Sequence, residues 1–432
     1  MIAHYNTIII GAGPAGLMAA IESYHPDKTT VVLERTTIPS MKFKMTGKGR
    51  CNITNSAPLD EFLTHFGKNH RFLRYAFHEF FNNELLKYFT DLGVQIKLER
   101  GGRYFPVSDK AIEVVNAMLE QVKSLNIPLQ VGKKVDKIIV QDDDTFKVIV
   151  KPVNKSDESI GKTIEYTADV VLIAMGGKSY PRTGSTGMGY KLAKDLGHKI
   201  IPPTPALVSL VTAGKTAKHL QGLSLKNVQV NVWCENKKSD ERFGEMLFTD
   251  KGVSGPIILS LSKNIILQLL EDKSVFISID FKPALYDKQL DARLLREINE
   301  HGNQNFSSLL KSLLPRKLIS VFVDKLGLDA DKLLNQITSN DRKRIRLLLK
   351  DFRMEVTGYG SYDEAIVTAG GVSIKDINPK TMESRKVKNL YFAGEIIDID
   401  ADTGGYNIQG AFSTGWVAGR SIRDISNKRS EE

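Results

Sequence analysis

The feature that most constrains this chain lies near its N-terminus, where a short apolar run leads directly into a glycine-rich loop. The segment 8–16 reads Ile-Ile-Ile-Gly-Ala-Gly-Pro-Ala-Gly, and a helical pattern continues from Pro14 to Ser23. A strand, a tight glycine turn and a helix in this order are typical of the first unit of a dinucleotide-binding fold. The pattern therefore predicts an α/β domain built on a parallel sheet.

The spacing of the glycines predicts how a phosphate group is held. The first glycine permits the tight turn, the second lets the backbone approach a pyrophosphate, and the third lets the helix pack on the sheet. Free N–H groups and the helix dipole favour an anion at the helix N-terminus. The predicted contacts in this loop are Gly11, Gly13, Pro14, Ala15 and Gly16.

An acidic residue follows the next predicted strand, Thr30–Leu33. Glu34 stands 18 residues after Gly16, where a carboxylate can accept hydrogen bonds from a ribose. We predict that Glu34 and its neighbour Arg35 contact the cofactor.

The C-terminal part of the chain favours FAD over NAD. Residues 389–395, Asn-Leu-Tyr-Phe-Ala-Gly-Glu, resemble the second FAD fingerprint of two-dinucleotide-fold flavoproteins, in which a strand ends in Gly-Asp. Here the acid is glutamate, and a nearby aspartate offers a second carboxylate. A predicted helix near residue 408 would direct backbone N–H groups at the flavin pyrimidine ring. The predicted contacts are Gly394, Glu395, Asp398, Gly405, Tyr406, Asn407 and Ile408.

Two further glycine-rich segments carry polar and cationic side chains. The first spans residues 45–55 and contains Thr46, Gly47, Gly49, Arg50, Cys51 and Asn52; the second spans residues 176–189 and begins at Gly176. Arg50 and Asn52 have side chains long enough to reach a phosphate or a flavin edge. Taken alone, each segment is equally compatible with an ordinary surface loop.

The order of predicted elements indicates a discontinuous first domain. Strand and helix patterns fill residues 1–199 and return at 360–432, so we expect these two ranges to form the FAD-binding domain. Residues 200–285 with 351–359 are predicted to form a β-rich inserted domain, and residues 286–350 a helical insert. Thr163–Tyr166 and Val170–Ala174 are predicted as two separate strands.

Composition excludes several classes of protein. Apolar and charged residues make up 41% and 25% of the 432 residues, as in a globular protein, and no run reaches the ~18 apolar residues of a membrane span. Two cysteines and the lack of a secretory signal favour a cytoplasmic location. The net charge of +10 is spread along the chain, with +6 in residues 1–199, +6 in 200–360 and −2 in 361–432.

Together these motifs identify a family. The chain resembles the YhiN/BaiN-like flavoproteins, which are described as NAD(P)/FAD-dependent oxidoreductases. The matching segments run in family order and are 11–16, Lys42 with 46–52, 179–189, 205–208, 252–256, 368–372 and 403–409. The resemblance implies a Rossmann-like FAD domain that carries a β-rich domain with a helical insert.

The resemblance also implies redox chemistry at the flavin, with NAD(P)H as a transient electron donor. Members have been associated with reduction of activated C=C bonds and with amine oxidation. Reduction of such a bond requires a hydride and a proton. The predicted proton donors are Cys51 and Tyr406 and, less directly, Lys48. We expect the cationic neighbour Arg50 to lower the thiol pKa of Cys51, although Cys51 also fits a packing role beneath the flavin.

The residues also bear on a metal site and on the class of substrate. Asp398, Asp400 and Asp402 begin like a calcium loop but lack its glycine and terminal glutamate, so no metal is expected. The substrate is predicted to be a small molecule or, alternatively, structured RNA with a uridine reduced to dihydrouridine. A basic stripe on one helical face favours the second possibility, and a solvated helix face is the simpler explanation. The stripe comprises Arg342, Arg346, Lys350 and Arg353.

Overall fold

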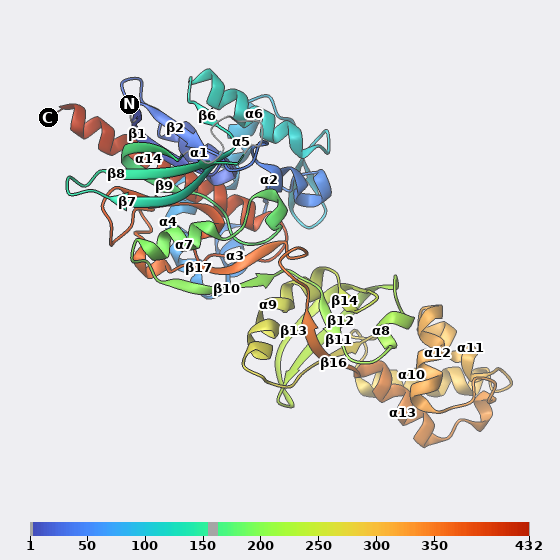
Figure 1. Ribbon diagram of the computed structural model, residues 1–432. Helices are drawn as coiled ribbons and strands as arrows, with labels where there is room; N and C mark the ends of the chain where they lie inside the picture. The colour runs from blue at the N-terminus through green and yellow to red at the C-terminus, as the bar shows by residue number, and fades with distance from the viewer. Residues whose placement is uncertain (1–2, 154–162, 432) are drawn as a thin grey trace. The chain divides into compact units, whose positions relative to one another are not determined.

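The chain forms two compact units in a computed structural model that describes residues 3–153 and 163–431 (Figure 1). One unit contains Met1–Pro205 and Ala365–Glu432, and the other contains Ala206–Glu364. The first unit thus ends at Pro205 and resumes at Ala365, a few residues beyond the predicted boundaries at residues 199 and 360. The reason is a two-stranded sheet of β10 (Ile200–Ala206) and β17 (Val367–Val372), which keeps most of β10 with the first unit.

The first unit is built on a seven-stranded sheet in the order β6-β2-β1-β9-β8-β7, with β18 also paired to β9. Strands β6, β2, β1, β9 and β18 run parallel, whereas β7 and β8 are antiparallel additions. The α/β Rossmann-like class predicted from the glycine loop is confirmed. The strands are β1 (Ala3–Ile10), β2 (Thr30–Leu33), β6 (Leu129–Gln130), β7 (Lys133–Val140), β8 (Phe146–Pro152), β9 (Ile164–Ile173) and β18 (Leu390–Phe392).

Strand β9 corrects the prediction of two separate strands at Thr163–Tyr166 and Val170–Ala174. It is continuous; its first half pairs with β8, and it pairs with β1 from Tyr166 to Ile173. Its burial alternates up to Asp169 and is continuous from Val170 to Ile173. The hydrophobic pattern of the sequence changes at the same point, because only the second half of the strand is covered on both faces.

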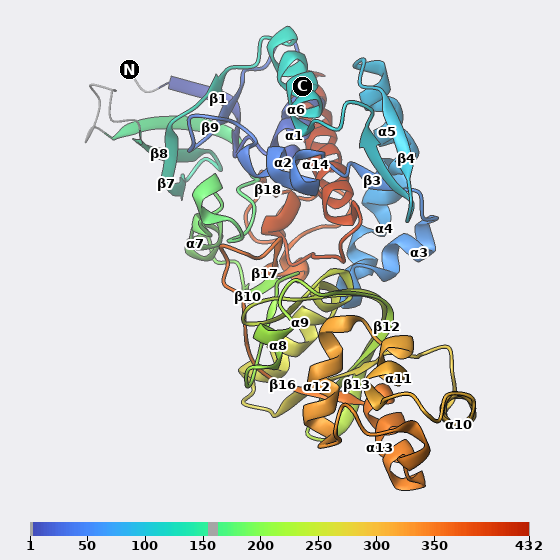
Figure 2. The same cartoon turned by 90° about the vertical axis from the view of Figure 1, so that its right-hand side faces the viewer.

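Helices α1 (Pro14–Glu22) and α14 (Tyr406–Glu431) pack against each other across the first unit (Figure 2). A Cβ atom on Gly415 would lie 2.4 Å from the carbonyl oxygen of Ala15, and one on Gly419 would lie 2.6 Å from that of Ala19. Small residues one helical turn apart thus bring the two backbones together. This contact joins the two ends of the sequence beside β1 and β18.

The first unit also contains a small sheet and further helices. A small antiparallel sheet has the order β3-β5-β4. Its strands are β3 (Thr54–Asn55), β4 (Ile96–Glu99) and β5 (Arg103–Pro106), and the helices are α2 (Met41–Met45), α3 (Leu59–Thr64), α4 (His70–Glu79), α5 (Asn82–Asp91), α6 (Ala111–Ser124) and α7 (Met188–Asp195).

The second unit is a closed barrel in the order β11-β14-β13-β12-β15-β16, accompanied by helices. Four helices follow β15, in the range predicted as a helical insert, and they share one hydrophobic core with the barrel. The strands are β11 (Leu210–Thr212), β12 (Ser224–Cys234), β13 (Lys237–Phe248), β14 (Gly252–Ser254), β15 (Val275–Asp280) and β16 (Phe352–Tyr359). The helices are α8 (Thr216–His219), α9 (Pro256–Leu270), α10 (Asp287–Glu300), α11 (Phe306–Leu313), α12 (Arg316–Leu326) and α13 (Ser339–Lys350).

Candidate cofactor-binding site

The glycine loop between β1 and α1 combines tight packing with one open position. A Cβ on Gly11 would lie 2.4 Å from the carbonyl oxygen of Ala174, and a Cβ on Gly16 would lie 1.9 Å from that of Gly11. A Cβ on Gly13 would meet no atom within 4 Å. Pro14 begins the helix and Ala15 is buried. The protein itself therefore requires the first and third glycines, while the second borders free space at the helix N-terminus.

Glu34 lies at the end of β2 and is bonded to the glycine loop. Its Oε2 accepts a hydrogen bond from the Ala12 N–H at 2.9 Å, and its Oε1 accepts from both the N–H and the Oγ1 of Thr36 at 2.7 Å. A carboxylate has about four acceptor positions, so one remains for a ribose hydroxyl. The neighbouring Arg35 donates to Thr186 Oγ1 at 2.7 Å, which ties it to the second glycine-rich segment.

Lys42 and Glu395, predicted from opposite ends of the sequence, form an ion pair with an Nζ–Oε2 distance of 2.6 Å. Ser179 Oγ accepts from Lys42 at 2.5 Å and donates to Glu395 Oε1 at 3.1 Å. The same Oε1 accepts the Thr368 N–H at 2.8 Å. Ser179 and Thr368 had not been singled out, although each lies in a segment that carries the family resemblance.

Two glycines beside this ion pair, Gly176 and Gly394, allow close packing around the Glu395 carboxylate and the start of α1. A Cβ on Gly176 would lie 3.9 Å from Glu395 Oε2, and a Cβ on Gly394 would lie 2.8 Å from the Ala15 side chain. Gly394 therefore sits against the first turn of α1. The second glycine-rich segment thus belongs to this cluster and is not an independent surface loop.

The loop from Thr46 to Asn52 has an unusual backbone. Gly47, Lys48, Gly49 and Cys51 all have positive φ angles, of 58°, 60°, 87° and 62°. For Lys48 and Cys51 this conformation is strained, and such strain is found at sites where the surrounding structure imposes it. The hydroxyl of Thr46 donates to the Phe43 carbonyl and holds the start of the loop at 2.7 Å.

The contacts of Arg50 are with the protein itself and do not support the predicted role at the cofactor. Its guanidinium donates to Glu99 at 2.5 Å and to Asp109 at 2.6 Å and 2.8 Å, and it lies 4.2 Å from the centre of the Phe105 ring. The cation is attracted to the two carboxylates of the small sheet and its flank. Arg50 therefore braces the loop from outside.

The prediction of a lowered thiol pKa for Cys51 is wrong. The side chain is fully buried, and burial raises its pKa to about 12, against a smaller opposing effect of a hydrogen bond with Thr46. With Arg50 engaged elsewhere, no stabilised thiolate results. The geometry supports the packing role for Cys51. Beside it, the Oδ1 atom of Asn52 is buried without a hydrogen-bond partner, which marks a position where a donor from a bound molecule fits.

The C-terminal loop reaches the Asn52 segment through Gly405, since a Cβ there would lie 2.6 Å from the Thr54 carbonyl group. Helix α14 begins at the next residue, Tyr406, and the first N–H groups of a helix lack intrahelical acceptors. The backbone of Asn407 and Ile408 therefore suits the predicted role. The side chain of Asn407, in contrast, forms hydrogen bonds with the backbone of Ala401 and Asp402 and stabilises the loop itself.

Two carboxylates of this loop have protein partners. Asp398 accepts from the Asn69 amide at 2.9 Å, so a role shared with Glu395 at the cofactor is not supported. The carboxylate of Asp402 lies 3.0 Å from Nδ1 of His65. Among the described residues, no group of acidic, histidine or cysteine side chains has the arrangement of a metal site.

His65, at the end of α3, also stacks on the Tyr406 ring, with centroids 3.9 Å apart and 19° between the planes. Tyr406 is buried among aromatic rings, and this burial, followed by the charges of Glu61 and Asp402, raises its pKa to about 12. The His65–Asp402 pair was missed in the sequence because the two residues are far apart along the chain. Their side chains are 27% and 21% exposed.

Of the predicted basic stripe, Arg342, Arg346 and Lys350 lie on α13, whereas Arg353 lies on strand β16, so the four side chains do not share one helical face. All four are paired with carboxylates of their own unit. Arg342 lies 3.1 Å from Asp291, and Arg346 lies 3.8 Å from the same carboxylate. Lys350 lies 2.5 Å from Asp280, and Arg353 lies 2.8 Å from Asp351. These contacts neutralise the charges that had favoured RNA.

The free space at Gly13, the remaining acceptor position of Glu34 and the unpartnered Asn52 oxygen fit a dinucleotide whose flavin carries hydrogen-bond donors. Fold and site together define the class, an FAD-binding flavoprotein of the oxidoreductases. The chain matches the model of the HI0933-like protein Rossmann domain over residues 5–421, and it belongs to that family.

Curated relatives extend over nearly the whole chain. A 3-dehydro-bile acid delta(4,6)-reductase of Clostridium scindens is 29% identical over 419 residues, covering 96% of this chain and 98% of the relative. A ribosomal RNA dihydrouridine synthase of Escherichia coli K12 is 28% identical over 418 residues, covering 97% and 98%.

A solved flavocytochrome c3 fumarate reductase in its open conformation shares the fold. The TM-score is 0.51 at 16% identity, covering 100% of this chain and 79% of that one. Among the described residues, no helix is long and apolar enough to cross a membrane.

Proposed function

We propose that this protein is an FAD-dependent reductase that adds a hydride and a proton across an activated C=C bond, with NAD(P)H as the electron donor. The proposal rests on the cofactor site together with the similarity to a relative named as a delta(4,6)-reductase over 96% of the chain. When bound, FAD supplies the hydride. The residues of the chain must hold the cofactor and deliver the proton.

The residues that would hold FAD are those that border the free space. The N-terminus of α1 at Gly13 suits the pyrophosphate, and Glu34 suits a ribose. The Lys42–Glu395 pair fixes the loops that follow β9 and β18. The Asn52 oxygen and the first N–H groups of α14 suit the donor and acceptor edges of the flavin.

The proton donor in this proposal is His65. Cys51 and Tyr406 both have a pKa raised to about 12 and are weak acids near neutral pH. Nδ1 of His65 lies 3.0 Å from the Asp402 carboxylate, which orients the imidazole ring and leaves Nε2 as the nitrogen that would deliver the proton. His65 contacts the ring of Tyr406, the first residue of α14, and so lies beside the loop that suits the flavin.

The experiment uses the FAD-loaded enzyme under anaerobic conditions. Flavin absorbance is followed after addition of NADH or NADPH, and an α,β-unsaturated ketone is then added and its saturated product measured by mass spectrometry. His65→Gln keeps a hydrogen-bonding side chain but removes the titratable group, so we expect kcat for reduction of the ketone to fall about 10²–10⁴-fold.

The rate of flavin reduction should be unchanged in His65→Gln, because that step needs no proton donor to the ketone. Tyr406→Phe is the matched control and should change kcat only slightly. Flavin that stays oxidised with both donors would remove NAD(P)H from the proposal. Full activity of His65→Gln would remove the assignment of the proton donor.

A second candidate function is reduction of uridine in ribosomal RNA. The observation that favours it is the 28% identity to a relative named as a ribosomal RNA dihydrouridine synthase, over 97% of the chain. The addition to uracil is also a hydride and a proton. Mass spectrometry of ribosomal RNA from a deletion strain tests it, and an unchanged dihydrouridine content would exclude it.

A further inference from the structure

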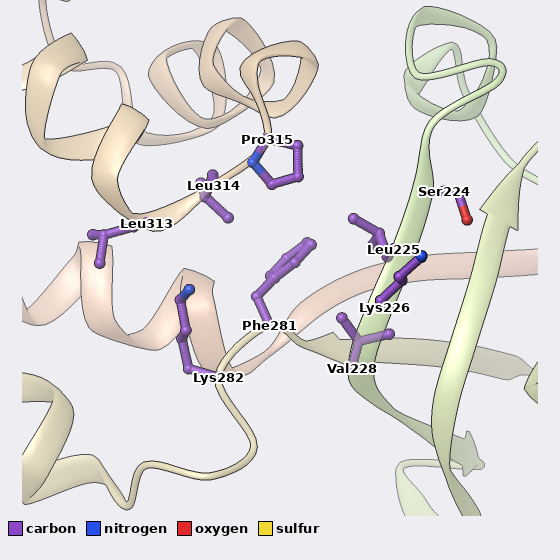
Figure 3. A pocket seen from close by; sticks show the side chains of 9 residues that line it. All are labelled: Ser224, Leu225, Lys226, Val228, Phe281, Lys282, Leu313, Leu314 and Pro315. Atoms are coloured by element: carbon purple, nitrogen blue, oxygen red, sulfur yellow. The ribbon is translucent and has the colours of Figure 1, made fainter.

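A pocket of about 280 Å³ lies in the second unit, between barrel strand β12 and the turn that joins α11 to α12 (Figure 3). Figure 3 shows Phe281 between the two sides, with Lys282 following it on the connection after β15. The lining residues are Ser224, Leu225, Lys226, Val228, Phe281, Lys282, Leu313, Leu314 and Pro315.

The walls of the pocket are apolar and fixed by the core. Leu225, Val228 and Leu314 are buried. Phe281 packs edge-to-face against two other buried phenylalanines, with ring centroids 5.6 and 5.7 Å away. Side chains held in this way keep their rotamers, so the pocket is preformed.

The partly buried cation of this pocket, Lys282, has no counter-charge among the described residues. Lys282 is half-buried, and its pKa is lowered by burial and, to a smaller extent, by the nearby Arg293. Within the described part of the chain, no carboxylate forms an ion pair with its ammonium group. The closest acid in sequence, Asp280, is committed to Lys350 at 2.5 Å and to the backbone N–H of Lys282 at 2.8 Å.

A partly buried cation without a partner is unfavourable, and an anion brought to it would offset that cost. We propose that this pocket binds a small amphipathic carboxylate, with its apolar part between Leu225, Phe281 and Leu314 and its carboxylate on Lys282. The exposed Lys226 and Ser224 at the rim add polar contacts.

The volume restricts the size of this ligand. Pockets for drug-sized molecules span roughly 300–1,000 Å³, so a pocket just below that range suits a short acyl chain or a single ring. The residues involved belong to the second unit and hold no part of the proposed FAD site. Binding can therefore be measured on the oxidised holoenzyme without turnover.

The test is calorimetric titration of the FAD-loaded enzyme with sodium octanoate, and with octan-1-ol as the uncharged ligand of equal chain length. We expect saturable binding of octanoate and at least tenfold weaker binding of octan-1-ol, since a charge-assisted hydrogen bond contributes roughly 1.5–3 kcal/mol, or about 10- to 150-fold in Kd. Lys282→Met should raise the Kd for octanoate by the same factor. Lys288→Met, an exposed lysine on α10, is the matched control and should leave the affinity unchanged.

A second measurement does not depend on heat signals. Octanoate should slow acetylation of Lys282 by acetic anhydride, measured by peptide mass spectrometry, while Lys288 reacts at the same rate with and without it. The proposal is overturned if octanoate shows no saturable binding, if Lys282→Met binds octanoate as tightly as the unmodified enzyme, or if octan-1-ol binds equally well.

Discussion

Replacing Gly13 by alanine tests whether the free space at the start of α1 belongs to a bound dinucleotide. A Cβ at this position meets no protein atom within 4 Å, and the φ and ψ angles of −86° and −178° suit alanine. The apoprotein should therefore keep its stability, or gain about 0.4–1 kcal/mol from the less flexible unfolded chain. Against a pyrophosphate the added methyl group overpacks the site, at a cost of about 1–3 kcal/mol, or roughly 5- to 150-fold in the Kd for FAD.

Gly16→Ala is the matched control on the same loop. Its Cβ would lie 1.9 Å from the Gly11 carbonyl oxygen, which is backbone and cannot move aside without distorting the turn. We expect Gly16→Ala to destabilise the apoprotein itself by about 1–3 kcal/mol or more. The two variants thus separate a glycine needed by the ligand from one needed by the fold.

The assay is the thermal unfolding of each apoprotein with and without added FAD. At FAD concentrations of about 100 times Kd, the unmodified protein gains roughly 2.7 kcal/mol, and a variant that binds about 100-fold more weakly gains only about 0.4 kcal/mol. Gly13→Ala should therefore unfold like the unmodified apoprotein but respond little to FAD. The reasoning is refuted if Gly13→Ala responds fully to FAD, or if its apoprotein is as unstable as Gly16→Ala.

Three further predictions follow from contacts and pKa values. Lys42→Met removes one side of an ion pair whose side chains are 22% and 20% exposed, and should lower the free energy of unfolding of the apoprotein in urea by about 1–3 kcal/mol. Lys191→Met breaks a pair whose side chains are 61% and 44% exposed and should cost at most about 0.5 kcal/mol. Equal effects of the two variants would contradict this prediction. Iodoacetamide at pH 8 should label Cys234 well before Cys51, whose thiol is buried with a pKa of about 12, and early labelling of Cys51 in peptide mass spectra would disprove it. The folded state raises the pKa of Tyr406 to about 12, so the stabilisation linked to this pKa shift is complete below pH ~10 and is lost as the pH rises towards 12. The urea midpoint of Tyr406→Phe should therefore decline less steeply at alkaline pH than that of the unmodified protein. An identical decline would argue against the raised pKa.

Short-range patterns predicted much of the fold because their signals are local. The order of strand, glycine loop and helix at residues 8–16 depends only on neighbouring residues, and the structure has β1 and α1 there. The range 286–350, predicted as a helical insert, contains helices α10, α11, α12 and α13. Strand β13 was missed, because the alternating charged residues from Lys237 onwards carry little apolar signal on a mostly exposed strand.

The candidate site was harder to predict where it depended on partners. Arg50 was predicted at the cofactor from its position between Gly49 and Cys51. In the structure its guanidinium donates to Glu99 and Asp109, which lie 49 and 59 residues further along the chain. The Cys51 thiol pKa went up, not down, because burial depends on packing and not on the adjacent residue. Sequence neighbours are a poor guide to the electrostatic environment of a side chain.

The glycine loop, by itself, determined that the chain has a dinucleotide-binding domain, because the conformation and close approach that glycine permits are properties of single residues. The C-terminal Gly394-Glu395 and the loop 46–52 then pointed to FAD and to the family. Only the tertiary structure decided which side chains meet: Lys42 with Glu395, and His65 with Asp402 and Tyr406. It also decided that Arg342, Arg346 and Lys350 of α13 are paired with carboxylates and that the second unit carries a pocket lined by Lys282, which has no ion pair among the described residues. These properties arise from residues far apart in the sequence, whose approach is fixed by burial of a common core.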